Sequence, residues 1–366
     1  MAGITRLNAR MNRRRVIAAS GGTALGAAIF GYVSLAAAQE SDVTVTMVTD
    51  TAGVGDQNFN DLAVLGGEQA AEELGVTFNI LESQTQADYS PNLAQGGETS
   101  DLTIAVGALL GDAVAEVAPQ FPDKFFALLD GVVEQDNVYS VVFREHEGSF
   151  LGGVLAALVS QSGVLGIIGG IRVPPVARYE IGFVAGARTI NPDIEVLISY
   201  ADSFEDPALG QELTLAQLNN GADVVLPIAG RTGVGSFDAV NEQGEGFWIM
   251  AGDTDQSHLA PGRQLAAIKK GVDVAFFDAT QAVVDGAFPG GTVDDLGLVD
   301  GGMDIYAFDA TVDQSMLDTV AAYKQAIIDG VIVAPGTDEE LAAFVPTPLD
   351  GEAATPAASP AATPAS

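Results

Sequence analysis

The sequence has no cysteine, two histidines, one tryptophan and few basic residues, with 15 lysines and arginines against 49 acidic residues. Without cysteine there is no disulfide, no thiolate nucleophile, no cysteine-ligated metal and no cysteine for a lipid anchor. The formal net charge of −34 opposes binding to nucleic acid, because its phosphates are repelled. We therefore expect no nucleic-acid partner.

Few residues offer catalytic or metal-binding chemistry. His146 and His258 lack the helical histidine partner of a zinc site, and we expect both at the surface. No G-x-S-x-G motif is present, and 53–58 lacks the third glycine of a dinucleotide fingerprint. The acidic run 253–257 lacks the glycine and closing glutamate of a calcium loop. These absences predict no catalytic residue, cofactor or metal.

Both termini differ in composition from the rest of the chain. Residues 1–38 contain five arginines and no acid, and an apolar run from 16 ends in three alanines. This pattern indicates an export signal, and its paired arginines resemble the twin-arginine type. An uncleaved membrane anchor is the alternative. Residues 346–366 are rich in Pro, Ala and Thr, which predicts a disordered tail. We expect an exported protein, either periplasmic or associated with the cell surface.

The rest of the chain alternates short apolar runs with helical patterns. A helix is predicted over 59–74, with Asn58 as its N-cap and Asp61 in its first turn. Apolar strands separated by helices indicate parallel sheets covered on both faces. This pattern fits either a barrel or two doubly wound lobes. The predicted strands cover 43–48, 76–81, 102–106, 125–129, 138–143, 164–168, 194–199, 224–228 and 247–250.

Polar and aromatic residues recur just after these strands. Asp50, Asp130 and Asp253 each follow a strand, while Phe59 opens the first helix and Phe204 follows a later strand. Ligands bind at the carboxyl edge of open parallel sheets, so these residues are candidates for one binding site.

Several segments, in this order, are similar to one known family. The sequence resembles the basic membrane protein family of ABC-transporter substrate-binding proteins, of the purine nucleoside receptor type, over about 43–335. The segments that carry the resemblance are 50–60 (DTAGVGDQNFN), 87–93 (ADYSPNL), 147–153 (EGSFLGG), 182–186 (GFVAG), 191–193 (NPD), 229–235 (AGRTGVG) and 251–256 (AGDTDQ).

The resemblance implies the type I periplasmic-binding-protein fold, in which two doubly wound α/β lobes are joined by a three-strand hinge. Lobe 1 would comprise 42–143 plus 265–300, and lobe 2 would comprise 144–264 plus 301–345. It also implies a monomeric, non-enzymatic receptor that delivers a nucleoside to ABC permease and ATPase subunits.

The resemblance further implies a nucleoside in the cleft between the lobes. Phe59 and Phe204 would sandwich the base, Asp130 would bind its edge, and Asp253 and Lys270 would bind the ribose. A glycine loop over 230–235 would let backbone amides approach the ligand. The complete predicted ligand-binding set is Asp50, Phe59, Asn60, Gly107, Asp130, Phe204, Gly230, Asp253 and Lys270.

The segment 106–110 has no polar side chain where family members commonly offer an amide to the base, which leaves the base undetermined. One alternative is a receptor for a sugar or an autoinducer-like polyol, since one aromatic ring with Asp253 and Asp50 would also serve a sugar. A second alternative is a secreted nucleoside hydrolase, although no dense carboxylate cluster for calcium is apparent.

Overall fold

The computed structural model describes residues 41–349. The predicted export signal over 1–38 lies outside these residues, as does most of the predicted tail over 346–366. Among the helices of residues 41–349, none combines the length and apolar character needed to cross a bilayer.

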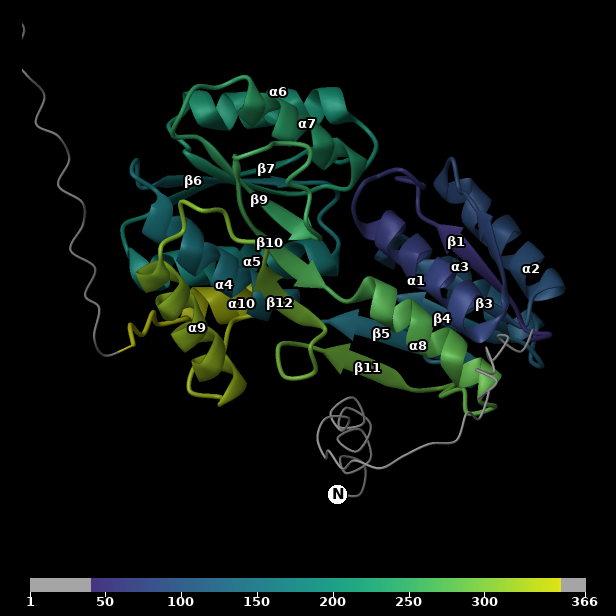
Figure 1. Ribbon diagram of the computed structural model, residues 1–366. Helices are drawn as coiled ribbons and strands as arrows, with labels where there is room; N and C mark the ends of the chain where they lie inside the picture. The colour runs from purple at the N-terminus through teal and green to yellow at the C-terminus, as the bar shows by residue number, and fades with distance from the viewer. Residues whose placement is uncertain (1–40, 350–366) are drawn as a thin grey trace, which may run out of the picture. The chain divides into compact units, whose positions relative to one another are not determined.

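Two six-stranded sheets organise the described residues (Figure 1). The strand orders are β2-β1-β3-β4-β5-β11 and β7-β6-β8-β9-β10-β12. Every neighbouring pair is parallel except β10 with β12. The two-lobed, doubly wound prediction is therefore confirmed, and the barrel is excluded. We call each sheet, with the helices packed on it, a lobe.

Lobe 1 contains most of the first third of the chain and one later segment. Its elements are β1 (Thr44–Thr49), α1 (Phe59–Leu74), β2 (Thr77–Leu81), α2 (Tyr89–Thr99), β3 (Leu102–Val106), α3 (Gly111–Val117), β4 (Phe125–Leu129), β5 (Val138–Phe143), α8 (Val272–Val284) and β11 (Val293–Leu296).

Lobe 2 contains the central part of the chain and the C-terminal helices. Its elements are α4 (Glu145–Val159), β6 (Val164–Gly169), α5 (Pro174–Ile190), β7 (Glu195–Tyr200), α6 (Pro207–Asn219), β8 (Val224–Ile228), α7 (Arg231–Asn241), β9 (Trp248–Asp253), β10 (Gln264–Lys270), β12 (Met303–Tyr306), α9 (Gln314–Ile328) and α10 (Asp338–Ala343).

The nine predicted strands are confirmed as β1 to β9, with small shifts at their ends. Three further strands were missed because their sequences are not continuous apolar runs. β10 ends in two lysines, and the short edge strands β11 and β12 carry aspartates. Charged residues are common on edge strands because they discourage pairing with another chain.

Three chain crossings join the lobes, between β5 and α4, β10 and α8, and β11 and β12. Backbone hydrogen bonds hold them together: Arg144 N donates to Leu296 O and Gly271 N donates to Gly302 O, both over 2.8 Å. The segment 265–300, predicted to lie in lobe 1, is divided. β10 pairs with β9 and β12 in the second sheet, whereas α8 packs on α1 and β11 pairs with β5.

Helices α4 and α5 pack with their backbones in contact. A Cβ atom on Gly153 would lie 2.1 Å from the carbonyl oxygen of Phe183, and one on Gly186 would lie 2.0 Å from that of Phe150. Glycine is therefore required at both positions. This close packing fixes α5, whose first turns face the other lobe.

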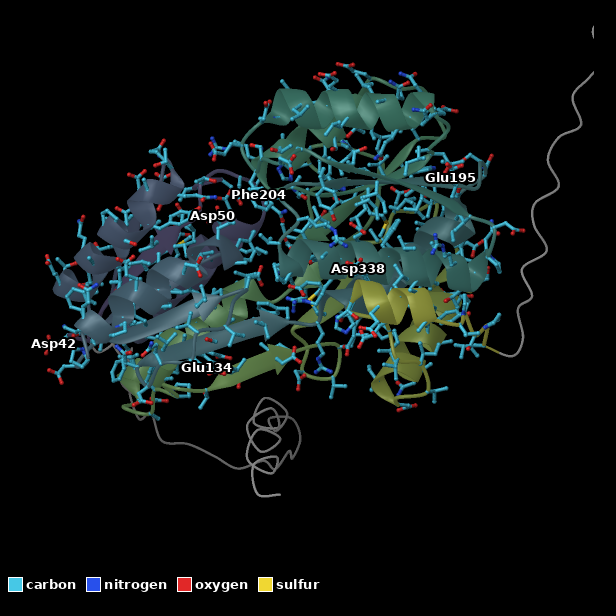
Figure 2. All side chains as sticks on the ribbon, turned by 180° about the vertical axis from the view of Figure 1, so that it is seen from behind. Asp42, Asp50, Glu134, Glu195, Phe204 and Asp338 are labelled. Carbon is cyan, nitrogen blue, oxygen red and sulfur yellow. The ribbon has the colours of Figure 1, made fainter. Side chains whose placement is uncertain are left out.

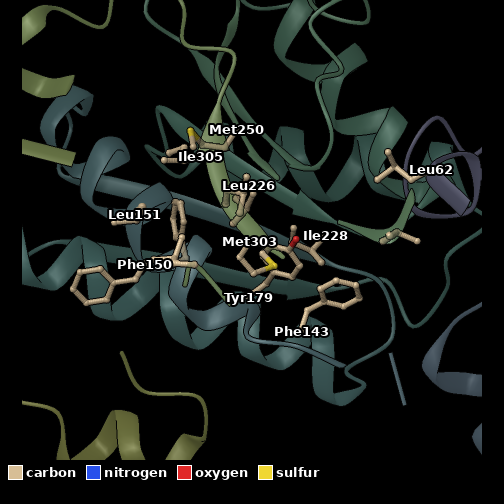
Figure 3. Packing of buried hydrophobic residues seen from close by; sticks show 14 of the residues in the cluster. Leu62, Phe143, Phe150, Leu151, Tyr179, Leu226, Ile228, Met250, Met303 and Ile305 are labelled. Atoms are coloured by element: carbon tan, nitrogen blue, oxygen red, sulfur yellow. The ribbon is translucent and has the colours of Figure 1, made fainter. Parts of the chain in front are cut away.

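An apolar cluster lies beneath the region where the lobes meet. It includes Phe143, Tyr179 and Met303 (Figure 3). The Nζ atom of Lys270 lies 5.1 Å from the ring centre of Phe143 and 5.9 Å from that of Tyr179. The charged end of this lysine is therefore surrounded by aromatic faces, which favour a cation.

Candidate functional site

A cavity lies where the carboxyl ends of strands from both sheets face each other. It encloses about 570 Å³ of unoccupied space, a figure that includes open solvent at its mouth. Asp50 lines it from lobe 1 and Phe204 from lobe 2 (Figure 2). In each sheet the cavity lies at the point where the strand order reverses, between β1 and β3 and between β6 and β8. Doubly wound sheets bind ligands at this point.

All nine residues selected from the sequence line this one cavity, although their contact with a ligand stays a prediction. They are Asp50, Phe59, Asn60, Gly107, Asp130, Phe204, Gly230, Asp253 and Lys270.

Other lining residues were missed by the sequence reasoning. Asp56 and Asn58 lie within the first motif, whose alternating polar residues were a usable signal. Tyr179 gave no such signal, because it lies in the apolar pattern of α5. Apolar side chains complete the wall, among them Ala52, Leu109, Val173, Pro175, Val176 and Ile228.

The loop before α1 is organised by Asp56 rather than by Asn58. Asn58 occupies the N-cap position of α1, as expected, but its side chain makes no capping hydrogen bond. The fully buried carboxylate of Asp56 instead accepts from the backbone N–H groups of Asn58 and Asn60, each over 2.9 Å. This arrangement positions Phe59 and Asn60 at the helix start, facing the cavity.

Asn60 joins two carboxylates at one side of the cavity. Its Nδ2 donates to Asp50 Oδ1 over 2.9 Å and to Asp56 Oδ2 over 3.0 Å. Gly107 leaves room for this group, because a Cβ atom there would lie 3.0 Å from Asp50 Oδ2. Burial raises the pKa of Asp50 to about 7, although the Asn60 hydrogen bond opposes the shift.

Lys270 lies at the centre of a second group, beside the crossings. Its Nζ is 2.6 Å from Asp130 Oδ2 and 2.9 Å from Glu145 Oε1. Arg178 Nε donates to the other Glu145 oxygen over 2.5 Å. Glu145 is fully buried and begins α4 directly after the first crossing. Neither Glu145 nor Arg178 was identified from the sequence.

Burial and the attraction between opposite charges shift the pKa values of this group in opposite directions. Burial alone would lower the pKa of Lys270, but Asp130 and Glu145 raise it above its usual range. Burial raises the pKa of Asp130 to about 6, against the attraction of Lys270. Burial would also raise the pKa of Glu145, yet Lys270 and Arg178 hold it below its usual range. Near neutral pH the group is therefore charged.

Asp253 completes this side of the cavity. Its Oδ1 accepts a 2.6 Å hydrogen bond from Tyr179 Oη. Asp130 and Asp253 both adopt positive φ angles, 73° and 60°, a conformation that few residues other than glycine tolerate. Both residues lie at the carboxyl ends of strands, so the strained turns help to direct the carboxylates into the cavity.

Three buried oxygen atoms lining the cavity have no hydrogen-bond partner among the described residues: Asn58 Oδ1, Asn60 Oδ1 and Asp130 Oδ1. Leaving buried acceptors unpaired is unfavourable. The cavity therefore suits a ligand that brings several donors, such as hydroxyl or ring N–H groups.

One aromatic ring from each lobe lines the cavity. Phe59 begins α1, and its ring centre lies 5.0 Å from Lys270 Nζ. The ring of Phe204 packs against the backbone of Gly170, where a Cβ atom would lie 2.3 Å from it. The two rings are only partly buried, so each retains surface for contact with a flat ligand.

The predicted glycine loop over 230–235 is largely helical. Helix α7 begins at Arg231, so Gly233 and Gly235 lie inside it. Only Gly230, at φ 53°, lines the cavity. At the start of α7 the backbone N–H of Thr232 donates to Phe204 O over 3.1 Å, and that of Gly233 donates to Gly230 O over 2.9 Å, so these two amides are already paired.

The raised pKa of Asp50 predicts a pH-dependent effect on stability. Between 3.8 and about 7 the folded state holds the proton that the unfolded chain releases, so Asp50 makes the protein less stable as pH rises. Asp50→Asn should therefore raise the free energy of unfolding, relative to the parent, by about 2–4 kcal/mol more at pH 8 than at pH 4. Urea unfolding at the two pH values measures this gain.

The exposed residue Asp123 provides the control, since Asp123→Asn makes the same chemical change at the surface, away from the cavity. An Asp50→Asn effect of equal size at both pH values would contradict the account of Asp50.

Comparisons with known proteins agree with this architecture. The sequence model of the Bmp family, described as ABC transporter substrate-binding protein PnrA-like, matches residues 43–337. A solved ABC transporter solute-binding protein from Aeropyrum pernix K1 superposes with a TM-score of 0.76 at 30% identity, covering 82% of this chain and 98% of its own.

Two relatives with curated names are also similar. The ABC transporter nucleoside-binding protein BmpA of Lactococcus lactis is 33% identical over 317 residues, which are 81% of this chain and 90% of the relative. An uncharacterized lipoprotein of Pyrococcus abyssi is 35% identical over 282 residues, which are 73% and 70% of the two chains. The present chain contains no cysteine.

Proposed function

Since the chain belongs to the Bmp family of PnrA-like ABC transporter substrate-binding proteins, we propose that its ligand is a purine nucleoside, bound between the lobes and released unchanged. Membership of this family implies an extracytoplasmic role with permease and ATPase partners. The observation that carries the proposal is the combination of one aromatic ring from each lobe with separate polar groups on two sides of one cavity.

The aromatic pair suits a flat heterocycle. Phe59 and Phe204 come from different lobes, so a base between them would contact both lobes at once. Stacking of a base on an aromatic side chain contributes about 1–3 kcal/mol. This contribution is complete only when the lobes are closed, which would favour the closed state.

The Lys270 group suits the ribose. Asp130, Asp253 and Lys270 lie together, and carboxylates accept strong hydrogen bonds from hydroxyl groups. Asp130 was expected at the base edge from the resemblance. Its 2.6 Å contact with Lys270 favours a shared role at the sugar instead.

The Asp50 and Asn60 group suits the edge of the base. Asp50, with its pKa near 7, can accept a hydrogen bond when ionised and donate one when protonated. Asn60 keeps an unpaired oxygen beside it, which can accept from a ring N–H or an amino group. A purine has both kinds of group on its edge.

The charge of the protein favours a neutral ligand. The net charge is −34, and the cation lining the cavity, Lys270, already faces two carboxylates. A nucleotide would bring phosphate charges into this negative field, whereas a nucleoside brings none.

Calorimetric and thermal-shift titrations of the ligand-free protein test the ligand class. Adenosine, guanosine or inosine should bind and raise the unfolding temperature, since binding to the folded state stabilises it. Cytidine should bind at least about tenfold more weakly, because its smaller ring makes less contact with the site. The same is expected of 2′,3′-dideoxyadenosine, because it lacks the ribose hydroxyls that would pair with the site. Ribose binding as tightly as the nucleosides would instead support a sugar receptor, and no stabilisation by any nucleoside would exclude the proposal.

Substitution of Phe204 tests the aromatic sandwich. Phe204→Ala should weaken purine nucleoside binding about 5- to 150-fold, which corresponds to the loss of about 1–3 kcal/mol of stacking. Phe204→Trp should retain binding. Phe308→Ala, at an exposed phenylalanine outside the cavity lining, serves as the control and should leave affinity unchanged. Parental affinity in Phe204→Ala, measured by calorimetry, would count against the sandwich.

A further inference from the structure

We propose that three side chains of lobe 2, those of Arg231, Gln256 and His258, hold the lobe 1 loop 54–57 against lobe 2 beside the cleft and so slow the escape of the ligand. The inference rests on the proposed function only in that a ligand occupies the cleft, and it does not depend on which ligand this is.

The contacts cross from one lobe to the other. Arg231 Nη2 donates to Val54 O over 3.0 Å, and Gln256 Nε2 donates to Gln57 O over 3.0 Å. His258 Nε2 lies 2.9 Å from Gln57 Oε1. None of these five residues lines the cavity, so the contacts are additional to those available to the ligand.

The loop is already shaped by lobe 1. Asp61 accepts from the N–H groups of Gly55 over 2.7 Å and of Gln57 over 3.0 Å. Glu82 accepts from Val54 N over 3.2 Å. These carboxylates satisfy the N–H groups within lobe 1, while the carbonyls of Val54 and Gln57 accept from the opposite lobe. The first turn acid expected at Asp61 therefore also organises the loop.

The lobe 2 side is equally well fixed. Gln256 is only 3% exposed, and its N–H donates to Gln264 Oε1 over 3.0 Å. Gln264 Nε2 in turn donates to Asp255 Oδ1 over 2.8 Å, and Asp255 N donates to Tyr306 Oη over 2.9 Å. These hydrogen bonds connect the backbone N–H of Gln256 to the first residue of β10 and the last residue of β12. Because these groups are already ordered, closing the lobes costs little conformational entropy here.

The loop leads directly into the ligand-facing residues Asn58, Phe59 and Asn60. When the lobes separate, the carbonyls of Val54 and Gln57 exchange their protein donors for water. The cross-lobe hydrogen bonds therefore stabilise the closed state selectively, and they increase the fraction of molecules that is closed. Because they form after the ligand has entered, their loss should increase the dissociation rate and change the association rate little.

Stopped-flow kinetics with adenosine as the probe tests this role. Arg231→Ala and Gln256→Ala should each speed dissociation about 3- to 10-fold, the effect of losing one net hydrogen bond. The double variant should dissociate faster than either single variant. Association should change less than about twofold. Arg231→Lys, which keeps a donor, should stay closer to the parent than Arg231→Ala.

Gln211→Ala is the matched control, because Gln211 Nε2 donates over 2.9 Å to Glu242 within lobe 2. It should leave both rates unchanged. Parental dissociation in the double variant would overturn the proposal. A fall in the unfolding temperature of the ligand-free double variant, with both rates altered alike, would also overturn it, because the side chains would then be merely structural.

A second measurement does not need adenosine to bind. The chain has no cysteine, so dyes can be attached through Gln69→Cys on α1 and Glu212→Cys on α6, both exposed. Single-molecule energy transfer should show a smaller closed fraction in the double variant than in the parent. An equal fraction would overturn the proposal, whereas failure of adenosine to bind would count against the proposed function alone.

Discussion

The buried ammonium of Lys270 is the group on which the cleft depends. A lysine that is 2% exposed is very unfavourable unless carboxylates neutralise it. Asp130 reaches it from lobe 1, and Glu145 reaches it from the start of α4. The need to neutralise Lys270 therefore brings the two lobes and the first crossing together around this side chain.

This arrangement determines what the cleft can bind. The charge of Lys270 is already balanced, and the remaining cleft groups are mainly acceptors, including the unpaired oxygens of Asn58 and Asn60. A ligand that is uncharged and rich in donors matches this pattern. The aromatic rings of Phe59 and Phe204 add a preference for a flat ring, so recognition combines two different physical requirements.

Much of the fold could be predicted because the inner strands among β1 to β9 are largely buried and rich in apolar residues, the pattern expected of strands covered on both faces. The edge strands β2 and β7 are more exposed, but they keep enough apolar residues to be recognised. β11 and β12 lie at sheet edges and carry aspartates, so no such pattern marks them. The division of 265–300 between the lobes also escaped the sequence, because strand pairing and not local pattern places β10.

The site residues differ in the same way. Asp50, Asp130 and Asp253 follow strands, so the rule for parallel sheets identified them. Asn60, Gly107, Gly230 and Lys270 were suggested by the family resemblance. Glu145 and Tyr179 could not be found, because each acts through a partner far away in the sequence, and only folding brings the pairs together.

Mass spectrometry of the small molecule released by denaturing the freshly purified protein identifies directly what the cleft binds. A cleft that encloses its ligand between two rings and a neutralised lysine should retain it during purification. We expect a purine nucleoside, at up to one molecule per chain. Release of a free sugar, or of any other compound without a purine ring, in that amount would show that the cleft is not a purine nucleoside site.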